Sequence, residues 1–379
     1  MASQLLEQLR SARLHLQRQG TDVDGVVGDN LGLHSTDYWS PYVSAWARLP
    51  ALDAAALYRR LNSGRGLVRI NCFRTTVHLV RVEDLPLLVA ATGEAAATIG
   101  RRSPTLRSLS GTEVRAGLDR VCAALADGPR GTNELKAALP DLAANLRDWL
   151  RTAMGEGEVI RADAPHARSN RSRYALTRAW VPGYAGPDRP PADARAEVLR
   201  RAVHAFGPLT EADLAWWLPA TRAEVKRALA SMGTAAAHLD VDGTRYWYAT
   251  PLADVPAPPR AEQGAWLLPY EDGLLKGYQE RAWCLEPGLK DVLFPYNIPH
   301  YYPPDGVGPP PGPKGGVNNS GEARPSIWWG GRAVGRWEER DGNVLFRIHA
   351  DVGADATRAI EAELARLEAF LATELGPIS

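Results

Sequence analysis

Cysteine is scarce in this sequence. The 379 residues include three cysteines, Cys72, Cys122 and Cys284, which are far apart and lie in apolar surroundings. An odd number of widely spaced cysteines argues against a disulfide framework and against a cysteine-based metal site. We therefore expect three buried free thiols. His204 and Glu211 also have no partner at metal-ligand spacing, so no metal site is predicted.

Long apolar runs are missing as well. The N-terminal stretch MASQLLEQLRSARLHLQ has no apolar core behind a basic flank. No other run approaches the roughly 20 apolar residues that a membrane helix needs. The sequence supports neither export nor membrane insertion, and we expect a cytoplasmic protein with no membrane partner.

The chain carries no net charge, because 44 basic residues balance 44 acidic ones. Its overall electrostatics therefore neither require nor exclude a nucleic acid as partner. Only local clusters of charge can decide that question.

What the sequence does contain is one pattern that occurs three times: helices followed by two short extended runs, the order of elements in a winged helix. The first copy has helical spacing at 2–18, 39–49 and 51–61 and extended runs within 66–80, with a turn at 74–76. The second copy covers 112–177 and the third 195–250. In the third, Gly207 and Pro208 end a helix, and Thr210 with Asp213 resembles a capping box.

The composition changes near residue 256. Aromatic and β-branched residues at 265–278, 326–340 and 343–350 predict a small all-β unit before a helix at 354–375, and the Pro- and Gly-rich segment 303–325 predicts a mobile surface loop. The fold class is thus α+β: three tandem winged-helix modules, a small C-terminal β-barrel-like unit and a terminal helix. We define the first module as 1–103, the second as 104–190, the third as 191–255 and the C-terminal unit as 256–379.

A basic loop interrupts the extended runs of the second module. The segment 164-APHARSNRSRY-174 places Arg168, Arg171 and Arg173 at the predicted tip of a wing. Guanidinium groups on a short polar loop suit contacts with phosphates and the minor groove. The alternative is a solvated turn with no partner. The position of the loop on a predicted wing favours contact with DNA over this alternative.

The segment 31-LGLHSTDYWSPYVSAWARLP-50 gathers four polar residues, His34 to Asp37, before a predicted helix. Ser35, Thr36 and Asp37 are all good N-caps, and Pro41 fits a first helical turn, so these residues alone favour a simple helix start. The alternative is a functional site.

Several motifs occur in a characteristic order: GLHSTD, SPYVSAWARLP, LVRINCFRTTVHLV, EDLPLL, FGPLTEADLAWWL, LLPYEDGLLKGYQER and GRAVGRWEER. Together they resemble the AlkZ/YcaQ family of bacterial DNA glycosylases over nearly the whole chain except 303–325. The resemblance implies tandem winged helices, a C-terminal β-barrel and excision of bulky N7-alkylguanine from double-stranded DNA, without metal or cofactor. It also makes the site interpretation of His34 to Asp37 the better one.

The family motif has Gln, an apolar residue and Gln (or Asp) where this sequence has His34, Ser35 and Thr36. An N7-alkylated guanine is already cationic, so it leaves without a general acid, and the enzyme need only stabilise sugar cation character and place a water. We predict that a neutral His34 holds this water and that Thr36 adds a hydroxyl contact. Ser35, Asp37 and His78 are expected to support the site, although a lone histidine such as His78 is more often a core residue.

The missing glutamines leave a rival interpretation open, namely a winged-helix regulator or resistance protein that binds DNA without catalysis. A hydrolase or transferase of small molecules is disfavoured, because there is no nucleophile elbow, phosphate loop or metal cluster. The glycosylase is expected to act as a monomer, with self-resistance to a DNA-alkylating natural product as one possible role.

Overall fold

The computed structural model describes residues 1–376 except for 17, 64–65, 170, 219, 252–263, 295–322 and 341. Most of the predicted loop 303–325 lies outside the described residues. Within the described ranges no helix is both long and apolar enough to cross a membrane. Cys72, Cys122 and Cys284 are free thiols, but Cys122 is only partly buried, which corrects the expectation of three buried ones.

The first module contains the helices and the two-stranded ribbon that the sequence predicts. Its elements are α1 (Ala2–Leu16), α2 (Val23–Asp29), β1 (Leu33–His34), α3 (Ser40–Trp46), α4 (Ala54–Leu61), β2 (Leu67–Asn71), β3 (Val77–Arg81) and α5 (Leu85–Arg101). Helix α5 was not predicted. Eleven of its 17 residues are buried, so it lacks the polar face that gives an amphipathic helix its sequence signature.

The second module repeats the order of helices and strands. It comprises α6 (Gly111–Ala124), β4 (Arg130–Gly131), α7 (Thr132–Ala138), α8 (Leu146–Gly155), β5 (Val159–Arg161), β6 (Arg173–Leu176) and α9 (Thr177–Trp180). Its strands join those of the first module in one six-stranded sheet, in the order β1-β3-β2-β5-β6-β4. The two ribbons meet where Arg69 of β2 pairs with Arg161 of β5.

Close helix packing reinforces the link between these two modules. A Cβ atom on Gly155 of α8 would lie 2.4 Å from the backbone nitrogen of Ala97 and 2.6 Å from the carbonyl oxygen of Gly93, both in α5. Glycine is therefore required for the two backbones to approach this closely.

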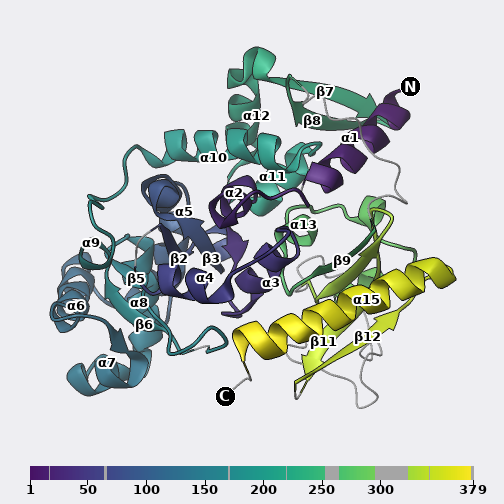
Figure 1. Cartoon of the computed structure of the whole chain (residues 1–379). Coiled ribbons are helices and arrows are strands. Elements are labelled where there is room, and N and C mark those ends of the chain that lie inside the picture. Colours follow the sequence, from purple (N-terminus) through teal and green to yellow (C-terminus); the bar gives the residue numbers. More distant parts are fainter. Residues whose placement is uncertain are drawn as a thin grey trace.

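The third module has α10 (Pro191–Phe206), α11 (Glu211–Trp217), α12 (Arg222–Ser231) and the separate hairpin of β7 (Ala236–Val241) and β8 (Thr244–Ala249). The predicted capping box is confirmed, since the Thr210 hydroxyl accepts from the backbone N–H of Asp213 and the Asp213 side chain accepts from that of Thr210. Helix α1 lies beside this hairpin rather than against the ribbon of its own module (Figure 1).

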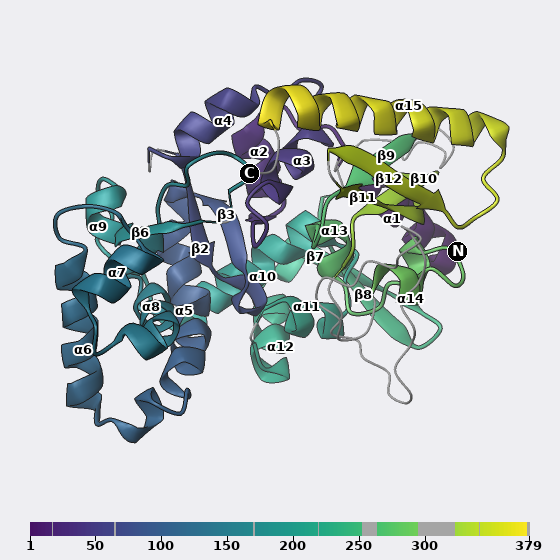
Figure 2. The same ribbon diagram turned by 90° about the horizontal axis from the view of Figure 1, so that it is seen from below.

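The C-terminal unit contains β9 (Ala265–Leu268), α13 (Gly273–Lys276), α14 (Lys290–Leu293), β10 (Ser326–Trp329), β11 (Arg332–Arg340), β12 (Asn343–Ile348) and α15 (Ala354–Phe370). Its described strands form an antiparallel sheet in the order β12-β11-β10-β9, in which β12 and β9 are the edges. Helix α15 runs along one face of this sheet (Figure 2). A closed barrel and the winged-helix identity of each module remain predictions, as do the domain boundaries.

The ribbon of β2 and β3 in the first module lies between the second module on one side and the C-terminal unit on the other (Figure 2). One apolar core contains residues of both the first module and the C-terminal unit, including Tyr42, Leu267, Trp337 and Ile360. The rings of Trp46 and Phe370 stack across this boundary at 5.8 Å. Shared burial of this kind fixes the C-terminal unit against the segment that contains His34.

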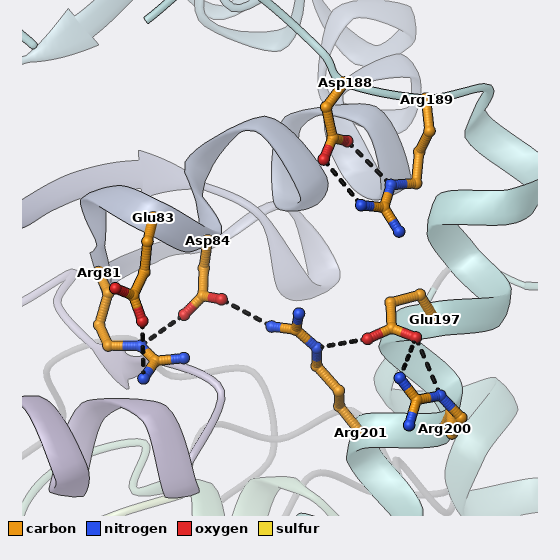
Figure 3. Close-up of polar contacts among 8 residues, drawn as sticks. All are labelled: Arg81, Glu83, Asp84, Asp188, Arg189, Glu197, Arg200 and Arg201. Atoms are coloured by element: carbon orange, nitrogen blue, oxygen red, sulfur yellow. Dashed lines mark hydrogen bonds and ion pairs between the residues drawn. The ribbon is translucent and has the colours of Figure 1, made fainter. Parts of the chain in front are cut away.

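Ion pairs connect the first module to the third (Figure 3). Asp84 accepts from Arg81 of its own module at 2.7 Å and from Arg201 of α10 at 2.6 Å. Arg201 also binds Glu197, one helical turn earlier, at 2.8 Å. The network lies beside the packing of α5 against α10 and links α10 to the residue just before α5.

Candidate active site

The segment around His34 is an edge strand and not a helix start. His34 pairs with His78 of β3, and Leu33 with Leu79. The backbone N–H of Ser35 continues the pairing by donating to the carbonyl of Val77 at 2.7 Å. Gly32, just before the strand, has a φ of 111°, which a residue with a side chain rarely adopts. The turn therefore delivers His34 directly opposite His78.

The helix-cap alternative for Ser35, Thr36 and Asp37 is wrong. Helix α3 begins only at Ser40, its N-cap is Trp39, and no side chain caps it by a hydrogen bond. Pro41 does lie in the first turn, as predicted. The polar residues thus stand ahead of the helix, where their side chains serve other contacts.

His34 is buried, with 6% of its surface exposed, whereas Thr36 is exposed. The Thr36 hydroxyl lies 3.1 Å from Nε2 of His34. Burial, followed by the positive charge of Lys276, lowers the pKa of His34 to about 3. The imidazole is consequently neutral near pH 7, as the sequence argument expected, but burial is the main cause.

His78 lies beside His34, with the two rings perpendicular and their centroids 5.4 Å apart. Nδ1 of His78 is 3.2 Å from the carbonyl of Thr76. A carbonyl only accepts, so this nitrogen carries the proton and Nε2 of His78 is left as an acceptor. Burial, and then the neighbouring His34, lower the pKa of His78 to about 3.

Ser35 and Asp37 have different surroundings. Ser35 is completely buried and accepts a hydrogen bond from Nε of Arg69 at 3.0 Å. The Arg69 guanidinium in turn lies 4.2 Å above the ring of Tyr38. Asp37 is half-buried, and its carbonyl accepts from the N–H of Ser40 at 3.2 Å. These contacts hold the backbone on either side of His34 and Thr36.

A small cavity opens in front of His34. The space open to a water-sized sphere is about 20 Å³, which is enough for one water molecule and too little for a purine base. The first module lines it with His34, Phe73, Arg74, Thr76 and His78, the third module with Trp217, and the C-terminal unit with Glu271, Gly273 and Lys276. The sequence prediction thus brought His34 and His78 together correctly, but it missed the side of the cavity that comes from distant segments.

Glu271 and Lys276 form a buried ion pair at 2.9 Å in this cavity wall. Oε2 of Glu271 lies 4.0 Å from Nε2 of His34. Burial lowers the pKa of Lys276, while the charge of Glu271 opposes this shift. The acidic pair Glu271 and Asp272, which follows the apolar strand 265–268 after only Pro269 and Tyr270, was the available sequence signal, because buried charges are rare unless they are partnered or functional.

Asp272 fixes the turn that carries Glu271. Its carboxylate accepts from both terminal nitrogens of Arg48, at 3.0 and 2.8 Å, and from the hydroxyl of Ser44 at 2.7 Å. It also accepts from the backbone N–H of Leu274 at 3.0 Å and so caps the short helix α13. Burial opposes ionisation, but Arg48 and these hydrogen bonds hold the pKa of Asp272 below its usual value.

The predicted wing divides into buried and exposed arginines. Arg168 does not point to solvent: only 5% of it is exposed, and it donates to Glu339 at 2.6 Å and to the carbonyl of Gly376 at 3.1 Å. Arg168 thus contacts the C-terminal unit, whereas the sequence predicted that it contacts DNA. Arg171 is exposed, and Arg173 is partly exposed while it pairs with Asp163 at 2.9 Å.

No described group of three or more histidine, cysteine, aspartate or glutamate side chains is arranged to hold a metal ion. The cavity thus gathers a neutral imidazole from the first module and a carboxylate and an ammonium group from the C-terminal unit around a space of the size of one water.

The comparisons with known proteins give the family. The chain belongs to the family of AlkZ-like DNA glycosylases, whose model matches residues 27–370. This confirms the resemblance stated from the sequence. Its fold matches that of Streptomyces sahachiroi DNA glycosylase AlkZ with a TM-score of 0.73 and 19% identity, over 96% of each chain. A comparison with curated proteins found no match.

Proposed function

We propose that this protein is a monofunctional DNA glycosylase that hydrolyses the N-glycosidic bond of bulky N7-alkylguanine in double-stranded DNA. Membership of the AlkZ-like family supports the reaction class. The observation that carries the proposal is a neutral, buried His34, next to the exposed hydroxyl of Thr36, at a cavity with room for one water.

The chemistry of the substrate suits these side chains. Alkylation at N7 makes guanine a cation, so the base departs without being protonated, and what remains is to stabilise the sugar and supply water. A neutral imidazole accepts a hydrogen bond from water through an unprotonated ring nitrogen. His34 is thus suited to hold a water, and Thr36 to complete its hydrogen bonds.

The proposal also covers the oligomeric state, the cell compartment, the fold of the modules and the range of substrates. The protein acts as a monomer in the cytoplasm, where its DNA substrate is found, and its three modules are winged helices. Because His34 and Thr36 replace longer amide side chains, the enzyme is expected to act on a narrow range of adducts. Protection of a cell from its own DNA-alkylating natural product would fit such a range.

The test is a base-release assay. Duplexes that contain N7-guanine adducts of increasing size are incubated with the protein and then treated with alkali, which cleaves abasic sites. We expect strand breaks with one bulky class of adduct and few with 7-methylguanine. Efficient release of 7-methylguanine would refute the narrow specificity while leaving the reaction class in place.

The departure from the family motif at His34, Ser35 and Thr36 favours one other function, a DNA-binding regulator without catalysis. Such a protein would bind one DNA sequence tightly and leave every adduct in place. The same duplexes therefore separate the two functions, because a regulator gives no alkali-labile breaks at any adduct.

A further inference from the structure

Glu271 is the one acidic side chain among the described residues that line the cavity at His34. It comes from the C-terminal unit, 237 positions after His34 in the sequence. Only 3% of its surface is exposed. A buried carboxylate at a reactive cavity calls for a reason, since moving an ion out of water is costly.

The distance between Glu271 and His34 suits a shared water. Oε2 of Glu271 and Nε2 of His34 are 4.0 Å apart, which is too long for a direct hydrogen bond. Polar atoms at such separations are often bridged by water, and the cavity of about 20 Å³ has room for one. The Thr36 hydroxyl lies 3.1 Å from the same Nε2 atom, so the water and this hydroxyl share the one hydrogen-bonding position of that nitrogen.

The carboxylate is held firmly. Glu271 has a φ of 58°, an unusual backbone conformation for a residue with a side chain, and such strain gathers at functional sites. Its N–H donates to the carbonyl of Ala323 at 2.8 Å, and Oε1 accepts from the N–H of Ala323. The next residue, Asp272, is fixed by Arg48 and Ser44.

Glu271 still has hydrogen-bonding capacity. A carboxylate offers about four acceptor positions. Oε1 uses one for Ala323, and Oε2 uses one for Lys276 at 2.9 Å. A free position on Oε2 can therefore accept from a water that lies between it and His34.

We propose that Glu271 is a catalytic residue that binds the attacking water together with His34 and accepts its proton. This inference rests on the proposed function. The water oxygen forms a bond to C1′ of the deoxyribose, the bond from C1′ to N9 breaks, and its electron pair neutralises the cationic base. The water proton passes to Oε2 of Glu271. Substrate cation and carboxylate thus become neutral base and carboxylic acid, with no other reactant.

The competing explanation is that Glu271 and Lys276 only form a structural ion pair. Two variants separate these explanations in single-turnover excision of the best N7-guanine adduct. Glu271→Gln keeps the shape of the side chain and an oxygen for Ala323, but it cannot take the proton. Lys276→Met breaks the ion pair and keeps the carboxylate. Glu286→Gln is the matched control, because Glu286 pairs with Arg332 at 2.6 Å in the same unit and is not among the cavity residues.

We expect Glu271→Gln to lower the excision rate by about 100- to 10,000-fold, the usual contribution of a general base, while DNA affinity stays unchanged. Lys276→Met should lose far less and Glu286→Gln nothing. The inference is overturned if Glu271→Gln excises within about threefold of the wild-type rate, or if Lys276→Met is as slow as Glu271→Gln.

If Glu271→Gln fails to fold, Glu271→Asp decides the question. It retains a carboxylate and should keep measurable excision, whereas a folded Asp variant without activity overturns the inference. Failure of the proposed function looks different, because the wild-type protein would then release no adduct at all. An active wild type with an equally active Glu271→Gln removes only the role of Glu271.

Discussion

The imidazole of His34 combines burial with a hydrogen bond to an exposed hydroxyl, and this position makes its role testable. We expect His34→Ala to slow single-turnover excision by about 100-fold or more, because the attacking water loses one of the two side chains that hold it. Thr36→Ala should have a smaller effect, since it removes one hydroxyl contact at the surface. The measurement is the rate of base release together with DNA affinity.

A second variant at the same position, His34→Gln, tests whether a hydrogen-bonding side chain is sufficient there. It restores the residue type that the family motif has at this position, and we expect it to keep more activity than the Ala variant. A His34→Ala protein that excises at the wild-type rate would exclude His34 from catalysis and would favour the regulator.

The two buried histidines also predict how stability depends on pH. Their folded pKa values are lowered to about 3, against about 6.5 in an unfolded chain. Below pH 6.5 the unfolded chain takes up protons that the folded protein refuses, so the stabilising contribution is complete above 6.5 and is lost as pH falls toward 3. At about pH 5 each histidine should cost up to about 2 kcal/mol.

Melting temperatures at about pH 7.5 and about pH 5 measure this effect. His78→Gln should reduce the loss between the two pH values. His238→Gln replaces an exposed histidine of β7 and serves as the control, with the wild-type loss retained. An identical loss in the His78 variant would show that this imidazole is not the source of the pH dependence.

Sequence reasoning identified half of the candidate site at the residue scale. His34, Thr36 and His78 could be selected because they belong to two neighbouring segments of one module, which pair as β1 and β3. The acidic pair at 271–272 could mark Glu271 as unusual, but the sequence could not place Glu271 and Lys276 beside His34, because their proximity depends on how the C-terminal unit packs against the first module. That packing involves a shared apolar core and the Arg48–Asp272 ion pair, neither of which leaves a local pattern.

At the scale of elements, the predicted order of helices and strands was largely correct where polar and apolar residues alternate clearly. Thr210 and Asp213 predicted the start of α11, and the β-branched residues of β2 and β3 predicted their ribbon. The sharing of one sheet between two modules was not predicted, because strand pairing between β2 and β5 involves residues 69 and 161, far apart in the chain. Helix α5 was missed because it is buried on most sides.

The wing of the second module gives a prediction that separates its arginines. Arg171 and Arg173 are exposed or partly so, and replacing both by Ala should lower the slope of log affinity against log salt by about two units, one for each lost phosphate contact. Arg358→Ala, an exposed arginine of α15, is the control and should leave the slope unchanged.

Arg168→Ala should behave differently from these variants. It would leave Glu339 buried without its partner, a change that typically costs about 3–5 kcal/mol. Thermal unfolding measures this loss. An unchanged salt slope in the Arg171 and Arg173 variant would remove the wing from the DNA interface, and an unaffected melting temperature for Arg168→Ala would contradict the buried contact.

For the molecule as a whole, the candidate site exists only where three parts of the chain meet. The first module supplies the imidazoles, the third module supplies Trp217, and the C-terminal unit supplies Glu271 and Lys276. Joint burial of apolar residues holds these parts together, and ion pairs set their relative orientation. The excision activity should therefore be sensitive to contacts that touch no substrate.

The Arg48–Asp272 pair is the sharpest test of this dependence. Its two side chains are each 1% exposed, and they join α3's C-terminal end to the turn that carries Glu271. Asp272→Ala removes the carboxylate that pairs with the buried guanidinium of Arg48 and should lower stability by about 3–5 kcal/mol. Asp240→Ala is the matched control: its pair with Arg245 at 3.0 Å is about half exposed, so its loss should change the stability far less. At a temperature where the Asp272 variant remains folded, excision should fall more than DNA affinity, because the turn that holds Glu271 loses its anchor while the exposed wing arginines are untouched.

Two outcomes would contradict a site assembled by the packing of the C-terminal unit on the first module. One is equal stability of the two variants in thermal unfolding. The other is a folded Asp272 variant that keeps the full excision rate.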